Sequence, residues 1–423
     1  MKPNCENRQP TAFWYQQDAL YCEEVPLAAI AERAGTPCYV YSSRSILEKF
    51  RAYDEALLDV PHQVYYAVKA NSSLGVLALL ASAGAGFDIV SGGELFRVLK
   101  AGGEPSSVVF SGVGKTAQEI EYALEQGIHS FNGESEAELA LIDALAARLR
   151  LRARVALRVN PDVDAATHPY ISTGLREHKF GIDIGEAEGV YERARAFGNL
   201  SMEGVSCHIG SQLLETAPVL EAAEKMLALV ERLRTKGLAI RFLDLGGGLG
   251  VSYRPDEAAP DIRGFVTQIR EKLAGRDLFL MLEPGRSVVA QAGVLLTRVL
   301  YRKSSASKEF VVVDAAMNDL IRPSLYEAHH EITPVRKTAR GTVLADVVGP
   351  VCETGDFLAR DRELANVLPG DLLAVATAGA YAFVAASNYN SRVRPPEVLV
   401  EGERWRIIRA RETYEDLVRG ERV

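Results

Sequence analysis

The stretch VYYAVKAN, residues 64–71, places one lysine at the end of an otherwise apolar run. Five apolar residues in succession, rich in valine and tyrosine, are typical of a buried strand, and Lys69 follows where a loop is expected to begin. A lysine in that position reaches water, pairs with an acid or takes part in chemistry. From this stretch alone a surface ion pair is the commonest role, so the rest of the chain has to decide.

Short apolar runs alternate with amphipathic segments through the first two thirds of the chain. Helical patterns cover 74–83, 93–103, 135–150 and 218–237, and the third opens on Ser135 with Glu138 three residues later, as in a capping box. Eight strands alternating with helices favour a (β/α)8 TIM barrel over an open doubly wound sheet. The expected strands are 64–70, 87–91, 108–112, 129–133, 155–160, 204–210, 242–248 and 278–285.

The pattern changes after residue 285. Strand-length runs then follow at short spacing with little helix between them, which predicts an all-β domain over 286–423. The sequence therefore predicts an α/β protein with a barrel at 37–285 and a C-terminal β domain. The N-terminal segment 1–36 fits neither pattern and is expected to pack on the β domain.

Composition narrows the class of protein. The chain has 423 residues and a formal net charge of -8, which argues against a nucleic-acid partner because such proteins need a basic face. Its five cysteines include no CxxC pair, so neither a metal site nor a disulfide framework is indicated. We expect a cytoplasmic protein without a signal peptide, without a membrane helix and with a small-molecule substrate.

Polar residues gather where the expected strands end, which is where barrel enzymes place their active sites. The strand ends deliver Lys69, Asn71, Asp88, Ser91, Arg158, Asn160, His208, Gly210, Ser211, Asp244, Gly246, Gly247, Gly248, Glu283, Gly285 and Arg286.

The glycine run after the seventh strand suggests an anion site. Without Cβ atoms, residues 246–248 let backbone N–H groups approach a phosphate, although a flexible turn is the plain alternative. A phosphate pocket together with a strand-end lysine points to pyridoxal 5'-phosphate, whose aldehyde condenses with a neutral lysine amine. His208 could then be a base, a stacking partner or a structural histidine. Glu283 could bond a pyridine nitrogen or cap a turn.

These fragments together resemble one family. YYAVKAN, FDIVSGGEL, HIGSQ, DLGGGLG and EPGR are similar to the barrel motifs of the fold-type III pyridoxal-phosphate decarboxylases, which have the alanine racemase-like fold. The stretches 314–332, 347–364 and 379–400 are similar to those of the diaminopimelate decarboxylase family. The resemblance covers roughly residues 12–415, and Ala316 and Ala382 stand where the family often has glycine. The loop 168–182 is expected to border the site.

The resemblance implies decarboxylation of meso-2,6-diaminopimelate to L-lysine, the last step of bacterial lysine biosynthesis. It implies a homodimer in which Cys352 and Glu353 reach into the partner's active site. The residues implied in catalysis are Lys69, Cys352 and His208. The cofactor would be bound by Lys69, His208, Ser211, Gly247, Gly248, Glu283, Pro284, Gly285, Arg286 and Tyr381, and the substrate by Arg286, Arg322, Tyr326, Glu353 and Tyr381.

Three alternative functions are considered, and the first of them keeps both the fold and the cofactor. Decarboxylation of ornithine, arginine or carboxynorspermidine is disfavoured by Arg286 and Arg322, which suit a distal carboxylate. Racemisation is disfavoured by Glu283, since racemases of this fold place an arginine near the pyridine nitrogen. A non-catalytic pyridoxal-phosphate carrier is disfavoured by the long β domain. Asp88 and Arg158 receive no firm role.

Overall fold

The structure is a computed structural model that describes residues 12–164 and 179–423. It divides into two compact units, one formed by Lys49–Val251 with Ala258–Ser287 and the other by Met1–Glu48, Ser252–Glu257 and Val288–Val423. We call the first the barrel unit and the second the β unit, and describe each by itself.

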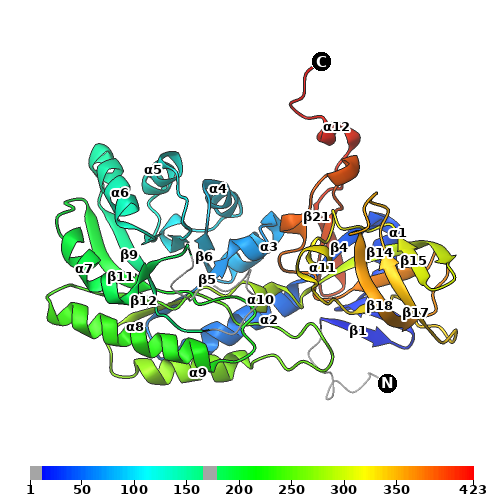
Figure 1. The fold of residues 1–423 in the computed structure, drawn as a ribbon, viewed down its shortest axis with the longest axis horizontal. Coiled ribbons are helices and arrows are strands. Elements are labelled where there is room, and N and C mark those ends of the chain that lie inside the picture. Colours follow the sequence, from blue (N-terminus) through cyan, green and yellow to red (C-terminus); the bar gives the residue numbers. More distant parts are fainter. Residues whose placement is uncertain (1–11, 165–178) are drawn as a thin grey trace. The chain divides into compact units, whose positions relative to one another are not determined.

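Eight parallel strands of the barrel unit close on themselves (Figure 1). Each strand pairs with the next, and β13 pairs with β5 to complete the ring. The predicted (β/α)8 barrel is therefore confirmed. The strands are β5 (His62–Ala67), β6 (Gly86–Ile89), β7 (Val108–Phe110), β8 (Ser130–Gly133), β9 (Ala153–Asn160), β11 (Leu200–Ser206), β12 (Phe242–Asp244) and β13 (Phe279–Leu282), with the short β10 (Ile182–Asp183) paired beside β9.

Helices follow most of these strands, as the alternating pattern predicts. They are α3 (Leu74–Ser82), α4 (Gly92–Lys100), α5 (Ala117–Gln126), α6 (Glu136–Leu149), α7 (Ile184–Ala194), α8 (Ala217–Thr235) and α9 (Ile262–Leu273). None of the helices in the described ranges has both the length and the apolar character needed to span a membrane.

The start of α6 differs from the expected capping box. Ser135 does cap the helix, because its side chain accepts from the Glu138 N–H. The Glu138 carboxylate, however, accepts from the Glu134 backbone N–H at 3.0 Å and from Lys115 Nζ at 2.5 Å. Leaving a buried ammonium without a carboxylate costs more than leaving an N-cap N–H without an acceptor. The Glu138 carboxylate therefore binds Lys115 and not the Ser135 N–H.

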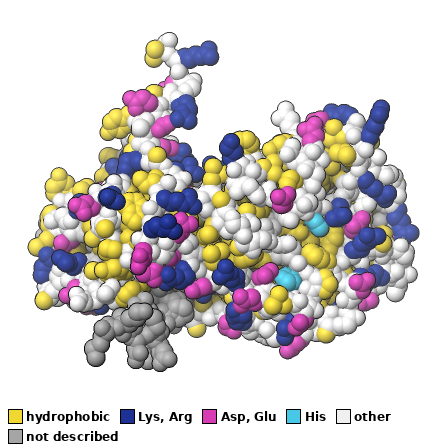
Figure 2. Space-filling view, turned by 180° about the vertical axis from the view of Figure 1, so that it is seen from behind, with side chains coloured by type: hydrophobic (Ala, Val, Ile, Leu, Met, Phe, Trp, Pro, Cys, Tyr) yellow, Lys and Arg dark blue, Asp and Glu magenta, His cyan; other side chains and the backbone are white. Residues whose placement is uncertain are grey.

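Exposed ion pairs join successive helices of the barrel unit. Such pairs are individually worth little, about 0–1 kcal/mol. Figure 2 shows the same intermingling of acidic and basic side chains across the visible face of the molecule. The pairs are Arg148–Glu121, Arg193–Glu136, Arg232–Glu188 and Lys272–Glu224.

The β unit is built around one long strand, β14 (Gly293–Ser304). Its first part pairs with β4 (Cys38–Ser42), its middle with β19 (Leu372–Val375) and its end with β15 (Glu309–Val313). The sheet order is β18-β17-β15-β14-β4-β20-β21, with β16 beside β19. The other strands are β16 (Ile332–Pro334), β17 (Thr342–Val348), β18 (Phe357–Ala365), β20 (Glu397–Glu401) and β21 (Arg404–Arg409).

The boundary expected at residue 37 differs from the structure. Strand β4 pairs antiparallel with β14 and parallel with β20, so it belongs to the β sheet and not to the barrel. The reason is burial on both faces, since all five residues of β4 are buried. An apolar run of that kind reads equally well as a barrel strand or as a central sheet strand.

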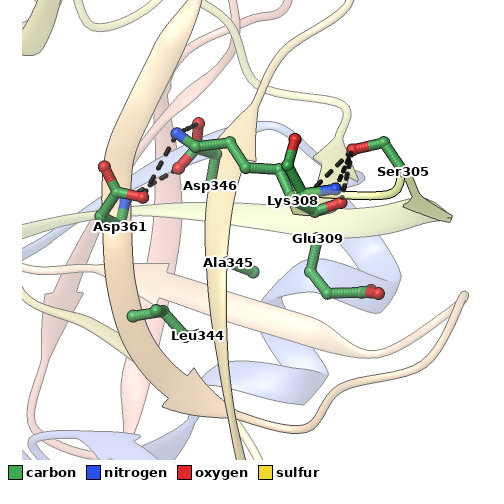
Figure 3. Close-up of a pocket in the computed structure, with 8 residues that line it drawn as sticks. Ser305, Lys308, Glu309, Leu344, Ala345, Asp346 and Asp361 are labelled. Atoms are coloured by element: carbon green, nitrogen blue, oxygen red, sulfur yellow. Dashed lines mark hydrogen bonds and ion pairs between the residues drawn. The ribbon is translucent and has the colours of Figure 1, made fainter.

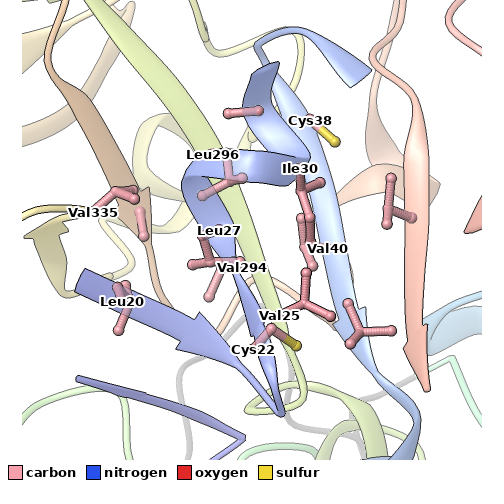
Figure 4. Close-up of a cluster of buried hydrophobic side chains, with 14 residues drawn as sticks. Leu20, Cys22, Val25, Leu27, Ile30, Cys38, Val40, Val294, Leu296 and Val335 are labelled. Atoms are coloured by element: carbon pink, nitrogen blue, oxygen red, sulfur yellow. The ribbon is translucent and has the colours of Figure 1, made fainter. Parts of the chain in front are cut away.

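The N-terminal residues contribute to the core of the β unit (Figure 4). They form β1 (Phe13–Gln16), β2 (Ala19–Cys22), β3 (Val25–Pro26) and α1 (Leu27–Ala34). Leu27 and Ile30 of α1 are buried with Val40 of β4 and Leu296 of β14.

The remaining α-helices are α2 (Ser43–Asp54), α10 (Arg286–Val289), α11 (Arg322–Tyr326) and α12 (Tyr414–Leu417).

Candidate active site

Side chains inside the barrel form an apolar layer, and the next layer, two residues further along each strand, is mostly polar. A buried cluster of Tyr65, Val109, Ala156, Phe242 and Met281 lies inside the barrel. Because alternate residues of a strand point to the same side, the inward residues two positions further on are Ala67, Ser111, Arg158, Asp244 and Glu283. The polar side chains of the site therefore lie at the C-terminal ends of the strands, directly above a layer of buried apolar side chains.

Lys69 lies in a short turn, Val68–Ala70, directly after β5. Its Nζ is hydrogen-bonded to Oδ2 of Asp88 on β6. The lysine side chain is 34% exposed while the Asp88 side chain is fully buried, so the amine is partly open to solvent and has a buried carboxylate beside it. Asp88, which had no role in the sequence analysis, is thus the partner of Lys69. A carboxylate, rather than an apolar wall, faces the amine in this state.

Glu283 lies in a buried network of acids and amides. Asn132 on β8 donates from Nδ2 to Asp244 Oδ2 at 2.9 Å and to Glu283 Oε1 at 3.4 Å. Burial, followed by the nearby charges of Asp244 and Asp88, raises the pKa of Glu283 well above its usual value, although Lys69 opposes this. Burial and the two neighbouring acids therefore favour the protonated form of the Glu283 carboxyl.

The glycine loop lies directly beside His208. The Gly247 N–H donates to His208 Nδ1 at 3.3 Å, so Nδ1 is an acceptor and the proton is on Nε2. Burial, followed by the charges of Arg158 and Lys69, lowers the pKa of His208 well below its usual value. The imidazole is consequently a flat, uncharged ring at physiological pH.

Only glycine fits this loop. Gly246 and Gly248 have φ of +65° and +108°, a region that side chains disfavour. A Cβ on Gly247 would lie 2.1 Å from the Glu283 carbonyl oxygen, and one on Gly248 would lie 2.5 Å from the Gly210 carbonyl oxygen. The loop is therefore packed against its neighbours as bare backbone, which is the geometry of a phosphate cradle.

The turn that carries Arg286 closes another side of the site. Arg286 Nη2 donates to Ser211 Oγ at 3.1 Å, which joins the loops after β13 and β11. The Ala67 N–H donates to the Pro284 carbonyl at 3.1 Å, and a Cβ on Gly285 would lie 3.0 Å from the Cβ atoms of Ala67 and Ala70. This turn therefore packs against the turn that holds Lys69.

Two buried ion pairs near the strand ends are absent from the sequence prediction. Arg158 Nη1 donates to Glu134 Oε1 at 2.9 Å, which gives Arg158 a partner. Lys115 donates to the carbonyls of Gly112 and Asn132, both at 2.8 Å, and to Glu138. The Lys115 bond to the Asn132 carbonyl fixes the strand that carries the Asn132 amide. The lysine in SGVGK after the third strand was the only sequence signal for this pair.

The β unit holds the other expected site residues. Arg322 begins α11, is buried, and has Nη1 3.2 Å from His330 Nε2. Tyr326 ends the same helix. Tyr381 has a left-handed φ of +55° and follows two buried residues, so its backbone is fixed.

Cys352 lies in a braced loop of the β unit and its thiol is exposed. The Cys352 N–H donates to Asn390 Oδ1 at 2.8 Å, and Tyr389 donates to Glu353 Oε2 at 2.6 Å. The Asp356 carboxylate accepts from the N–H groups of Val351 and Met317, both at 2.7 Å. The loop is thus held on both sides of Cys352.

One further hollow of the β unit, about 260 Å³ in volume, is lined by Lys308 and three acids, Glu309, Asp346 and Asp361 (Figure 3). Lys308 Nζ lies 2.6 Å from Asp346 Oδ2 and 3.3 Å from Asp361 Oδ1. The charge of Lys308 is compensated by the two aspartates inside the hollow, so the hollow does not compete with the barrel site as a catalytic centre.

Most of the loop 168–182, which was expected to border the barrel site, lies outside the described residues.

The side chains at the barrel mouth fit pyridoxal phosphate. Lys69 supplies an amine, Glu283 a buried acid for a ring nitrogen, His208 a flat neutral surface, and the glycine loop a cradle that a Cβ would fill. Fold and site together define the class of fold-type III pyridoxal-phosphate enzymes.

Comparison with known proteins agrees with this class. Residues 43–290 match the family model of the pyridoxal-dependent decarboxylase, pyridoxal binding domain. Diaminopimelate decarboxylase of Pseudomonas aeruginosa is 59% identical over 97% of this chain and 98% of its own length. Two solved diaminopimelate decarboxylases, both in complex with L-lysine, are also similar. That of Helicobacter pylori has a TM-score of 0.89 at 44% identity and covers 93% of this chain and 98% of its own. That of M. jannaschii has a TM-score of 0.92 at 38% identity and covers 97% of this chain and 98% of its own.

The chain therefore belongs to the diaminopimelate decarboxylase family, within the pyridoxal-dependent decarboxylases.

Proposed function

We propose that the chain converts meso-2,6-diaminopimelate to L-lysine and CO2 with pyridoxal 5'-phosphate as cofactor. The observation that carries the proposal is the Lys69–Asp88 pair at the mouth of a closed barrel, in a chain that is 59% identical to a diaminopimelate decarboxylase over nearly its whole length.

When bound, the cofactor supplies an electron-withdrawing ring that accepts the electron pair left by the broken C–CO2 bond. Lys69 would hold the cofactor through its amine, with the Asp88 carboxylate beside that amine to pair with its ammonium form. Glu283 would hydrogen-bond the ring nitrogen, which would favour electron withdrawal by the ring. His208 would contact the ring with an uncharged imidazole.

The phosphate is bound by backbone and side-chain donors. In our proposal these are the Gly248 N–H, the Ser211 hydroxyl and the turn Glu283–Pro284–Gly285–Arg286, with Tyr381 contributing its hydroxyl. Gly247, whose N–H is bonded to His208, leaves room for the phosphate because it lacks a Cβ. Such donors suit a dianion because each offers a hydrogen bond without a large rearrangement.

The distal end of the substrate is a zwitterion and needs both signs of charge. Arg286 and Arg322, with Tyr326 and Tyr381, are proposed to bind its carboxylate, and Glu353 its amine. A site built for these charges rejects ornithine or arginine, because its own charged groups would lack partners. The Cys352 thiol delivers a proton to the carbon that CO2 has left, and water restores the thiol proton.

We also propose a homodimer in which Cys352 and Glu353 act in the partner's site. The support is the family resemblance together with the braced loop, which presents an exposed thiol and carboxylate away from the core of its own unit. A cytoplasmic location is proposed because a catalytic thiol must stay reduced, and Cys22, Cys38 and Cys207 are also free cysteines.

Release of CO2 tests the substrate assignment. Purified protein with pyridoxal phosphate should release CO2 from meso-diaminopimelate and form lysine, with ornithine and arginine as comparison substrates. Faster turnover of either comparison substrate would reject the proposed specificity.

A further inference from the structure

Tyr389 binds the carboxylate of Glu353 from a different segment of the β unit. Its hydroxyl donates to Oε2 of Glu353 at 2.6 Å, although the two residues are 36 positions apart in the sequence. Tyr389 is 44% exposed, so the bond lies at the surface, in the loop that also presents the exposed Cys352. The Glu353 carboxylate raises the pKa of Tyr389, first by accepting its hydrogen bond and then through its charge. The hydroxyl therefore keeps its proton and remains a donor.

The backbone of Glu353 is fixed on both sides. Its N–H donates to the Val351 carbonyl at 2.8 Å, and its carbonyl accepts from the Asp356 N–H at 3.1 Å. A Cβ on Gly355 would lie 3.3 Å from the second carboxylate oxygen, Oε1, so the glycine leaves that oxygen uncrowded. With the backbone held, the Tyr389 bond decides where the carboxylate points.

The turn that carries Tyr389 is held independently of its hydroxyl. Asn390 has a left-handed φ of +56°, which asparagine adopts more readily than most residues, and its Oδ1 accepts from the Cys352 N–H at 2.8 Å. On the other side of Tyr389, Asn388 Nδ2 donates to the Arg392 carbonyl at 3.0 Å. The turn is therefore tied both to itself and to the loop of Cys352, so removal of the hydroxyl alone leaves the ring in place.

A phenol hydroxyl orients a carboxylate without neutralising it. An arginine or lysine at position 389 would form an ion pair with Glu353, and a ligand ammonium would then have to compete with that cation. The tyrosine hydroxyl has no charge and occupies one oxygen of the carboxylate. Its bond thus aims the negative charge of Glu353 and does not cancel it.

We propose that Tyr389 is a positioning residue that sets the preference for a ligand with an ammonium group at the end far from the cofactor. The inference rests on the proposed function, because it takes Glu353 as the site of the distal amine. The ligand class is an amino acid whose distal end is a zwitterion, as opposed to one whose distal end is a carboxylate alone.

L-Lysine and 6-aminohexanoate provide the test, because they differ only by the α-amino group of lysine. In the proposed reaction this group belongs to the distal end, since the reacting end has lost its carboxylate. The dissociation constants of both ligands would be measured on the holoenzyme by titration calorimetry. Tyr389→Phe keeps the ring and removes the donor, and Tyr301→Phe, at an exposed tyrosine of β14, is the matched control.

We expect Tyr389→Phe to weaken lysine binding by about tenfold, the scale of one hydrogen bond to a charged group. Binding of 6-aminohexanoate should change by less than about twofold, since this ligand has no distal amine for Glu353 to bind. The KM for diaminopimelate should rise with kcat largely kept. Tyr301→Phe should bind both ligands as wild type does, and Glu353→Gln should lose at least as much lysine affinity as Tyr389→Phe.

Two results would overturn the inference while leaving the proposed function intact. One is an equal loss of lysine and 6-aminohexanoate binding in Tyr389→Phe, which indicates a merely structural role. The other is unchanged lysine binding in that variant while Glu353→Gln loses it. If Glu353→Gln itself binds lysine as tightly as wild type, the assignment of Glu353 in the proposed function fails, and this inference fails with it.

Discussion

Asn132 donates from Nδ2 to Asp244 Oδ2 across 2.9 Å, which joins β8 to β12 inside the barrel. Asp244 in turn accepts from the Gly246 N–H at 2.9 Å, and Glu283 donates its backbone N–H to the Gly246 carbonyl at 2.7 Å. The glycine loop and the acid for the ring nitrogen are therefore positioned by one connected set of bonds.

Replacing Asn132 should loosen both parts together. Asn132→Leu keeps the size of the side chain but removes the donor, leaving Asp244 and Glu283 close to each other without the amide between them. We expect the dissociation constant of pyridoxal phosphate to rise by about tenfold, measured by absorbance titration of the apoprotein. Asn199→Leu, at the opposite end of the strands where Asn199 bonds Asp143, is the control and should bind normally. Unchanged affinity in Asn132→Leu would show that the network does not position the cofactor site.

Lys69→Ala should lose the near-visible absorbance that marks a covalently held cofactor, because no other amine replaces Lys69 beside Asp88. Lys100→Ala, which removes an exposed lysine on α4, should keep the absorbance. Absorbance spectra of both purified proteins after addition of pyridoxal phosphate test whether Lys69 holds the cofactor. Retained absorbance in Lys69→Ala would refute the assignment.

Mixing two inactive variants tests the shared site. If Cys352 acts in the partner's site, Lys69→Ala and Cys352→Ala subunits form a mixed dimer with one intact site. Random pairing should then restore about one quarter of the wild-type activity. Each variant alone, assayed at the same total concentration, is the control. A mixture no more active than these controls means that each subunit uses its own cysteine.

The buried Asp319 should make stability depend on pH. Burial is the main cause that raises its pKa to about 7, against about 3.9 when unfolded. Between these values the folded state holds a proton that the unfolded state has lost, so the free energy of unfolding falls as pH rises from about 4 to 7. Asp319→Asn removes this titration. As pH rises from 5 to 8, the free energy of unfolding of the variant should increase relative to that of wild type by on the order of 2 kcal/mol. Denaturant titrations at each pH measure it.

The exposed Asp256 provides the control for that measurement. Asp256→Asn, the same change at an exposed position, should unfold at the same denaturant concentration as wild type. If Asp319→Asn also tracks wild type across this range, the Asp319 carboxyl does not carry the raised pKa.

Replacing one member of the buried Arg158–Glu134 ion pair should strongly reduce the free energy of unfolding. Both side chains are nearly buried, so Glu134→Gln leaves the Arg158 charge uncompensated and should destabilise the fold by about 3–5 kcal/mol. Glu136→Gln, which breaks the exposed pair with Arg193, should leave the unfolding midpoint nearly unchanged. Urea unfolding of the two variants compares them directly, and similar midpoints would contradict the prediction.

The sequence predicts features that depend on local pattern. The eight barrel strands, the Ser135 cap and the position of Lys69 follow from apolar runs and their ends. Asn132, Lys115 and His330 could not be predicted, because each works through atoms on strands or loops distant in the sequence. The membership of β4 in the β sheet could not be predicted for the same reason, since its partners β14 and β20 lie at the other end of the chain.

The pairing of β4 with β14 also has a consequence for synthesis of the chain. β4 leaves the ribosome before the barrel and β14 after it, so the barrel is inserted between two neighbouring strands of one sheet. Strand β4 therefore has no strand partner until translation has passed β14, whereas Val40 can already pack on Leu27 and Ile30 of the preceding helix. The sheet that contains β4 can form only after the barrel has been synthesised.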